Sequence, residues 1–308
     1  MSAFSAINLD QLPVPQIIDQ PTFEEIYALR VARLLELAAD FGAPDYIAGL
    51  ESALELESEP LVQLLQEDSY REMLLRAAVQ DAGKGNLLAF ATGAVLDHLG
   101  AFYGVARLVH QEAAPYAVPP VPEILETDGR LRARIQLAPE GLTSAGSEGS
   151  YVYWSLSASS HIKDIAVLQT ATPGEVRIVA LSTEGTGTAS PEILTAIDEI
   201  TEPRRPLNDT VIIESATLVS YAVEAELTLF EGPDAELVRT TAEAALLAFV
   251  DLHHRLGHDI TVAGLHSALY QPGVQDVVLI SPASSIVNEA DAAAFCTGVT
   301  VTVVGRDV

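Results

Sequence analysis

The stretch that decides the fold is Leu56–Leu108, LESEPLVQLLQEDSYREMLLRAAVQDAGKGNLLAFATGAVLDHLGAFYGVARL. Its apolar residues recur at helical spacing, and the pattern is interrupted at Pro60, at Gly83 and Gly85, and at Thr92-Gly93. Helix-breaking residues at these points predict a set of helices that turn on one another. The polar face of these helices is too narrow for a free-standing bundle. The stretch therefore predicts a helical segment whose apolar surface is covered by something else.

The apolar residues of this stretch identify candidate partner-facing positions. A large apolar side chain left in water forfeits roughly 1.5–3 kcal/mol relative to burial. So many of them in a short span predict a surface that binds partner helices. The positions expected to face the partner are Leu61, Leu64, Leu65, Leu74, Leu87, Phe90, Leu96 and Leu99.

The composition argues against two classes of partner. The chain has 308 residues, enough for two or three domains, and a net charge of −27, with 16 Lys and Arg against 43 Asp and Glu. Nucleic acid and anionic membranes both attract clustered positive charge, so neither is an expected partner. Hydrophobic residues nevertheless make up 49% of the chain, which predicts filled cores plus apolar surface reserved for other chains.

The sequence also bears on compartment. A single cysteine, Cys296, excludes an intramolecular disulfide and a Cys-based metal cluster. The N-terminal residues MSAFSAINLDQLPVPQ lack the basic region and apolar core of a signal peptide. No apolar run approaches the roughly 20 residues that span a bilayer. We therefore expect a protein that is made and kept in a cytoplasm.

Proline-rich segments predict the domain boundaries. Residues 111–122, QEAAPYAVPPVP, have four prolines and no periodicity, which predicts a stiff linker. A second junction is expected at Pro203-Arg204-Arg205-Pro206. The predicted domains are a helical domain with an extended N-terminal arm (1–115), a middle domain (116–205) and a C-terminal domain (206–308). Both junctions are predicted to act as hinges between domains that keep their internal packing.

Local signals predict the elements within these domains. In the first, Thr22 and Glu25 form a capping-box pattern for a helix that ends at Gly42, and a second helix is expected from about 45 to 59. The middle domain is expected to have helices at 123–137 and 190–200 and strands at 165–168 and 176–181. The C-terminal domain is expected to have strands at 221–229, 277–280 and 299–304 and helices at 234–256 and 262–270. The fold class is therefore predicted to be α+β: a helical bundle segment followed by two small α+β domains with antiparallel sheets.

A glycine-containing loop, Gly185–Ser190, is the first candidate for chemistry. It follows a predicted strand and precedes a predicted helix, as a dinucleotide-binding loop does. Ser190 replaces the third glycine of that motif, and we expect no parallel β–α–β context around it. The favoured interpretation is a tight strand-to-helix turn with Ser190 as N-cap. A nucleotide-binding enzyme that uses this loop is the alternative.

Three histidines, His253, His254 and His258, form the second candidate. Gly257 is expected to end the helix between them, and a closed metal site needs further ligands that the sequence does not supply. Their favoured role is to interact with the negative end of the helix dipole. No catalytic triad pattern is present either. The sequence predicts no catalytic residue, cofactor or metal, and hence no enzyme.

Several strings, taken together and in order, resemble one family. They are LESEPLVQLLQE, ATGAVLDHLGAFYGVARL, RARIQLAPEGLTSAGSEGSYVYWS, GTGTASPEIL, RRPLNDTV, LGHDITVAGLHSAL and GVQDVVLISP, with DGRLRARI overlapping the third. These strings are similar to segments of the baseplate assembly protein J family of contractile-tailed bacteriophages. The resemblance extends over most of the chain.

The resemblance implies a structural component of a baseplate wedge, which links the central hub to the sheath and the tail-fibre attachment and rearranges on triggering. The implied partners are a second copy of the chain, a wedge protein of the protein I type, the sheath-initiating wedge protein and the tail fibre. The two copies in a wedge are expected to differ by rotation at the predicted hinges. The implied location is the tail baseplate of a virion or tail-like particle, assembled in the cytoplasm of a host bacterium. An assembly scaffold or chaperone that is absent from the mature particle is the alternative.

Overall fold

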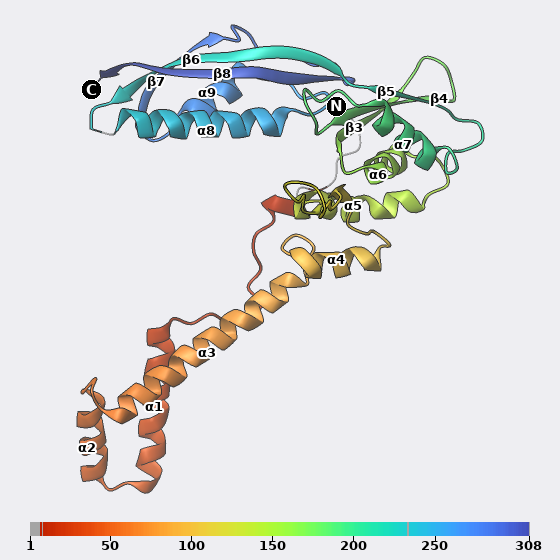
Figure 1. The fold of residues 1–308 in the computed structure, drawn as a ribbon. Coiled ribbons are helices and arrows are strands. Elements are labelled where there is room, and N and C mark those ends of the chain that lie inside the picture. Colours follow the sequence, from red (N-terminus) through yellow and green to blue (C-terminus); the bar gives the residue numbers. More distant parts are fainter. Residues whose placement is uncertain (1–6, 8, 233, 308) are drawn as a thin grey trace. The chain divides into compact units, whose positions relative to one another are not determined.

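The computed structural model describes residues 7, 9–232 and 234–307. The chain divides into two compact units (Figure 1), one formed by Asn8–Leu99 and the other by Gly100–Val308 together with residues 1–7. The structure thus belongs to the predicted α+β class. The first unit is helical, and the two three-stranded sheets both lie in the second unit.

The first unit begins with the 3₁₀ helix η1 (Leu9–Gln11), followed by α1 (Phe23–Phe41), α2 (Pro44–Leu54) and α3 (Pro60–Gly85). The capping box predicted for α1 is confirmed: the Glu25 N–H donates to Thr22 Oγ1, and the Thr22 N–H donates to the Glu25 carboxylate. Helix α2 ends earlier than predicted. Pro60 holds the preceding residue, Glu59, in an extended conformation (φ −69°, ψ 128°), so the helix cannot continue to 59. Helix α4 (Gly93–Phe102) follows and runs across the boundary between the units.

The predicted linker at 111–122 is instead the loop of a β-hairpin. Strand β1 (Val109–Gln111) pairs antiparallel with β2 (Ile124–Leu125), and Ala114 forms a further bridge to Val121. Because β2 occupies Ile124–Leu125, the predicted helix at 123–137 begins later, as α5 (Asp128–Leu137). The hairpin strands are too short for their period to be visible beside so many prolines.

The middle of the chain forms a three-stranded sheet covered by helices. After η2 (Ala138–Leu142) and α6 (Glu148–Ala158), β3 (Ile162–Gln169) and β4 (Glu175–Ser182) form an antiparallel hairpin that includes both predicted strands. Helix α7 (Pro191–Thr201) then leads to β5 (Thr210–Ser215), which pairs with β4 in parallel. The sheet is therefore mixed, and β4–α7–β5 is a parallel crossover. Tyr151 and Trp154 lie in its core.

The C-terminal sheet has the order β7-β6-β8, and α8 and α9 cover one of its faces (Figure 1). The elements are β6 (Thr217–Phe230), α8 (Ala235–His253), α9 (Val262–Leu269), β7 (Val274–Ser281) and β8 (Ala292–Asp307). The strand predicted at 221–229 is confirmed as part of β6, and its side chains alternate, since Val223 and Leu227 are buried while Glu224 is exposed. Strand β7 pairs with β6 antiparallel and β8 pairs with it in parallel, so this sheet is mixed as well.

The two sheets are joined without a hinge. Only Ala216 separates β5 from β6, and its N–H donates to Ala180 O at 2.9 Å. One buried cluster spans both sheets: Ala166, Val179, Leu181, Ala216, Leu256 and Ala293. Rotation at Pro203–Pro206 would break this cluster and the pairing of β5 with β4. The prediction of a hinge at that junction is therefore wrong, although the segment is a turn, with the N–H groups of Arg204 and Arg205 both donating to Thr201 O.

Candidate interaction surface

The eight predicted partner-facing side chains lie in different environments. Leu64, Leu74 and Leu87 are 58%, 49% and 39% exposed. Leu61, Leu65, Phe90 and Leu99 are partly buried. Leu96 is fully buried and in this conformation offers no surface to a partner. For the other positions, contact with a partner stays a prediction.

Further exposed apolar side chains lie on the same helices. On α3, Leu75 is 67% exposed and Val79 is 50% exposed, four residues apart and hence on one face. On α1, Leu29 and Phe41 are 68% and 90% exposed. Only Ile26 and Ala38 of α1 are buried. The exposed apolar surface therefore extends beyond the stretch that predicted it.

Ion pairs fix α1 against α3 within the first unit. Arg30 of α1 binds Glu72 of α3 at 2.9 Å and Asp68 at 3.7 Å. Arg76 binds the same Glu72 at 2.9 Å. The hydrogen bond from Arg76, with further help from Arg30, lowers the pKa of Glu72. These bonds set the register of the two helices, so their remaining apolar faces are held in a defined place.

The N-terminal arm is docked on α3 through one buried side chain, Gln80, which is 7% exposed. Its Oε1 accepts the N–H groups of Ile17 (2.8 Å) and Ile18 (3.3 Å), and its Nε2 donates to Pro15 O at 2.7 Å. Gly83 lies one turn further along α3. A Cβ at this position would come within 2.3 Å of Ile17 Cδ1, so the glycine makes room for the arm. The part of the predicted arm at residues 1–6 and 8 lies outside the described residues.

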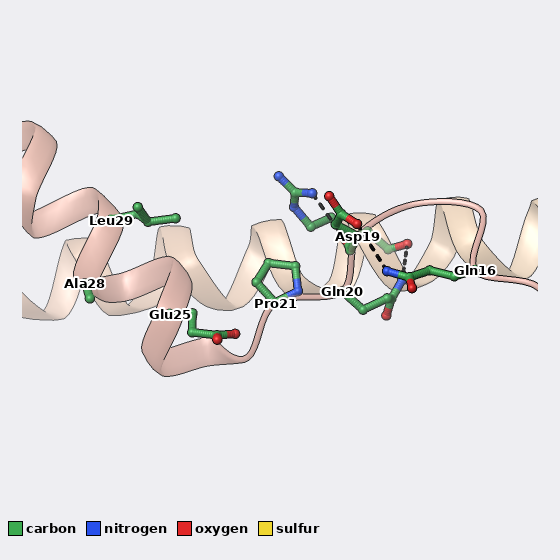
Figure 2. Close-up of a pocket in the computed structure, with 8 residues that line it drawn as sticks. Gln16, Asp19, Gln20, Pro21, Glu25, Ala28 and Leu29 are labelled. Atoms are coloured by element: carbon green, nitrogen blue, oxygen red, sulfur yellow. Dashed lines mark hydrogen bonds between the residues drawn. The ribbon is translucent and has the colours of Figure 1, made fainter.

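An open groove lies beside the arm, between it, α1 and α3 (Figure 2). It is lined by Gln16, Asp19, Gln20, Pro21, Glu25, Ala28, Leu29 and Arg76. Its polar groups hold the arm: Gln20 Nε2 donates to Arg76 O at 3.0 Å, and Arg76 Nη1 donates to Asp19 O at 3.3 Å. The groove is therefore part of the arm's docking site.

The glycine-containing loop is a strand-to-helix turn with Ser190 as N-cap, as favoured from the sequence. The expectation that no parallel context surrounds it was wrong, because β4 and β5 are parallel. The loop is nevertheless closed by its own chain. The Gly187 N–H donates to Glu184 O at 3.0 Å, and the Ala189 N–H donates to Ser215 Oγ at 2.9 Å. Gly187 adopts φ +104°, and a Cβ there would lie 2.9 Å from His254 Nε2.

The histidines lie where α8 meets the sheets of the second unit. His253 ends α8 and its ring stacks on Phe249, while His254 is the C-cap residue. Beside His254, Lys163 of β3 binds Asp251 of α8 at 2.6 Å. Burial, followed by the charge of Lys163, lowers the pKa of His254. Within the described part of the chain, no group of three or more His, Cys, Asp and Glu is placed to hold a metal ion.

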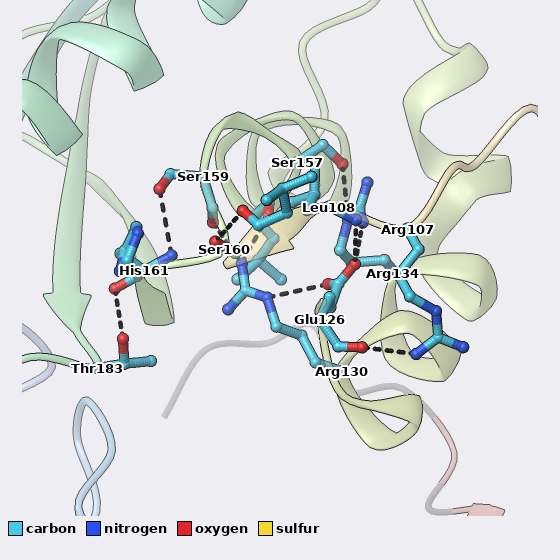
Figure 3. A network of polar contacts seen from close by, with 12 residues as sticks. Arg107, Leu108, Glu126, Arg130, Arg134, Ser157, Ser159, Ser160, His161 and Thr183 are labelled. Carbon is cyan, nitrogen blue, oxygen red and sulfur yellow. Dashed lines mark hydrogen bonds and ion pairs between the residues drawn. The ribbon is translucent and has the colours of Figure 1, made fainter. Parts of the chain in front are cut away.

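A buried ionic network at the base of the hairpin was missed from the sequence (Figure 3). The Glu126 side chain has no exposed surface and accepts from Arg134 Nη1 at 2.6 Å and from Arg130 Nε at 3.0 Å. Its Oε2 also accepts the Leu108 N–H at 3.1 Å. Burial lowers the pKa of Arg130. The spacing of Glu126 four residues before Arg130 was the available signal for the pair.

The same arginines fasten the hairpin to α5 and α6. Arg130 Nη2 donates to Ser159 O at 2.6 Å and to Leu156 O at 3.0 Å. Arg134 Nη1 donates to Ala106 O at 3.2 Å. The network thus has a structural role, since the two arginines of α5 bond both to the base of the hairpin and, through Arg130, to the end of α6.

Comparisons with known proteins found three family models that match successive parts of the chain. The Baseplate J-like N-terminal, central and C-terminal domains match residues 57–114, 143–215 and 221–302. Baseplate protein J of Escherichia phage P2 is 40% identical over 303 residues, which span 98% of this chain and 99% of that protein. The chain belongs to the baseplate J family. The gap between the central and C-terminal family matches, 216–220, falls where β5 passes into β6.

A chain in the cryo-EM structure of the anti-feeding prophage baseplate, 6-fold symmetrised, is similar in structure to part of this baseplate J chain. The similar region covers 61% of this chain and 47% of that chain, with 13% sequence identity and a TM-score of 0.41. The family membership follows from the sequence matches alone. It supports a structural role in the baseplate of a phage or tail-like particle. No helix among the described residues of this baseplate J protein is long and apolar enough to cross a membrane.

Proposed function

We propose that this chain is a permanent structural component of a baseplate wedge and that its helical unit binds helices of other baseplate proteins. The observation that carries the proposal is the exposed apolar surface of α1 and α3, where Leu29, Leu64 and Leu75 are each more than half exposed. Exposed large apolar side chains gathered on neighbouring helices are typical of interaction sites. Family membership supplies the setting, a baseplate, in which such a surface has partners.

The proposed partners are a wedge protein of the protein I type and a second copy of the chain, with further contacts to the sheath-initiating wedge protein and the tail fibre. The eight positions predicted from the sequence stay the proposed contact set, except Leu96, which is buried. Leu75 and Val79 are added to it because they are exposed on α3. Partner helices that cover these residues would complete the bundle that the first unit only begins.

The rearrangement on triggering is proposed to leave the middle and C-terminal parts as one body. Their shared cluster and the nearly continuous β5–β6 strand support this. The two proposed copies in a wedge would then differ at the connection between the two compact units and nowhere further along the chain. This replaces two expected hinges by one.

The test uses a particle whose own gene for this chain is deleted and supplied in trans. We expect Leu75→Asp with Val79→Asp to prevent incorporation of the chain into particles and to abolish sheath assembly. The matched control is Leu207→Asp, because Leu207 is 98% exposed but lies outside the helical unit. Equal assembly with both variants would contradict the proposal. Absence of the native chain from finished particles would instead favour the scaffold or chaperone.

A further inference from the structure

The end of the first unit where α1 turns into α2 carries a one-sided charge. Residues 34–70 contain nine Asp and Glu and no Lys, Arg or His. Seven of these acids lie in residues 34–59, which we call the acidic tip. Of the seven, only Glu36 forms an ion pair with a described residue, Arg33. The charge of the tip is therefore largely uncompensated within the described part of the chain.

Three of the carboxylates also oppose the helices that carry them. Asp40 lies in the last turn of α1, Glu51 lies in the last turn of α2, and Glu55 is the C-cap residue of α2. The C-terminal end of a helix carries a partial negative charge, so an acid there destabilises the helix and a base would stabilise it. Neither helix has a basic residue in its last turn. These positions reduce the stability of the free chain.

The same tip exposes apolar surface. Helix α2 has 11 residues and none of them is buried. A helix this short is marginal in water unless a packed face supports it. Phe41 is 90% exposed, Tyr46 59% and Leu56 57%. The tip, where α1 turns into α2 (Figure 1), thus combines an under-packed helix, exposed aromatic side chains and mostly unpaired carboxylates.

We infer that the acidic tip is a docking surface for a Lys- or Arg-bearing amphipathic segment of another baseplate protein. Such a segment would place its apolar residues on Phe41 and Tyr46 and its cations beside Asp40, Glu51 and Glu55. Charge complementarity selects a cationic occupant. Its cations would offset the unfavourable free energy of acids at helix C-termini, and they would do so only while the partner is bound. The inference rests on the proposed function, in which the helical unit is the partner-binding part of the chain.

A second copy of the chain does not fit this surface. The whole chain has 16 Lys and Arg against 43 Asp and Glu, a net charge of −27, and its only lysines are Lys84 and Lys163. Contact between two acidic surfaces costs free energy through repulsion at every pair of like charges. The helical unit would therefore bind two different partners at two surfaces. The apolar face of α3 would bind a second copy, and the acidic tip would bind a cationic chain.

The first test reverses charge on α2 in the full chain, as Glu51→Lys with Glu55→Lys. The control, Glu199→Lys with Glu224→Lys, makes the same change in net charge at two exposed acids of the second unit. Each variant is co-expressed with the baseplate proteins encoded beside it. At about 0.05 M salt we expect roughly tenfold weaker complex formation for the α2 variant only, with the difference fading as salt rises. Its melting temperature should not fall, because lysine suits a helix C-terminus.

Complex formation that is equal for the α2 variant and its control would overturn the inference. If Leu75→Asp with Val79→Asp still abolished assembly, the proposed function would stand; if that variant too had no effect, both would fall. A carbodiimide cross-link, which joins a carboxylate to a lysine amine, then identifies the occupant. Cross-links from the tip to lysines of another baseplate protein support the inference. Cross-links to Lys84 or Lys163 of a second copy overturn it.

Discussion

Replacing Glu126 with Ala should unfold the region around the hairpin at much lower denaturant. The side chains of Arg134 and Arg130 are only 5% and 17% exposed, and both depend on the Glu126 carboxylate for compensation. Removing one partner of a buried ion pair leaves an uncompensated charge and costs about 3–5 kcal/mol. The variant also leaves the Leu108 N–H without its acceptor.

The chain carries its own probe for this experiment, because Trp154 is the only tryptophan. It lies on α6, the helix whose Leu156 carbonyl accepts from Arg130. Urea unfolding is followed by Trp154 fluorescence. With a slope of about 2–3 kcal/mol per M urea, the expected loss moves the midpoint down by about 1–2.5 M.

The matched control is Glu236→Ala. Glu236 also binds an arginine, Arg239, at 2.6 Å, but its side chain is 71% exposed. Water compensates the remaining charge there, so the midpoint should hardly move. If both variants shifted the midpoint by the same small amount, the buried Glu126 network would contribute no more to stability than an exposed ion pair does.

Three further predictions concern the arm, the junction between the sheets and the glycine loop. Gln80→Leu removes the amide that holds the arm and should cost about 1–3 kcal/mol and speed proteolysis within residues 9–20, whereas exposed Gln63→Leu should leave the digestion rate unchanged. The pKa of His254 is lowered in the folded chain, so on acidification the unfolded chain binds a proton at this histidine first. The contribution of His254 to stability is therefore full above about pH 6.5 and is lost as the pH falls through the folded pKa. His254→Gln should make the urea midpoint less dependent on pH between pH 7.5 and 5.5, and an unchanged dependence would contradict this. Gly187→Ala should destabilise the Trp154 transition by roughly 1–3 kcal/mol, since it combines φ +104° with a clash, whereas Gly298→Ala, which has open space around it, should not.

Sequence periodicity predicted most elements but not how the strands pair. The alternation along β6 marks its buried face correctly, yet the same alternation arises in parallel and antiparallel pairs. The parallel β4–β5 and β6–β8 pairs therefore could not be read from it. Proline content also misled at 111–122, because prolines fit a hairpin loop as well as a linker. For the parallel pairs, the deciding contacts come from residues far apart in the chain.

The candidate surface was only partly predictable for a related reason. The apolar positions of α3 follow from helical spacing, but burial of Leu96 depends on tertiary packing that spacing does not contain. The acidic tip was visible in the sequence as a run without Lys, Arg or His. Its significance appears only when α2 is found to bury none of its own residues. The ionic network around Glu126 had a local signal, whereas its burial had none.

The measurement that tests the central claim most directly is quantitative mass spectrometry of purified, tail-bearing particles that contain this chain. If the chain is a permanent wedge component, it should be present in finished particles at a fixed ratio to the other baseplate proteins, and the ratio should survive removal of loosely bound material by salt. Loss of the chain from finished particles, with its presence confined to assembly intermediates, would contradict the account.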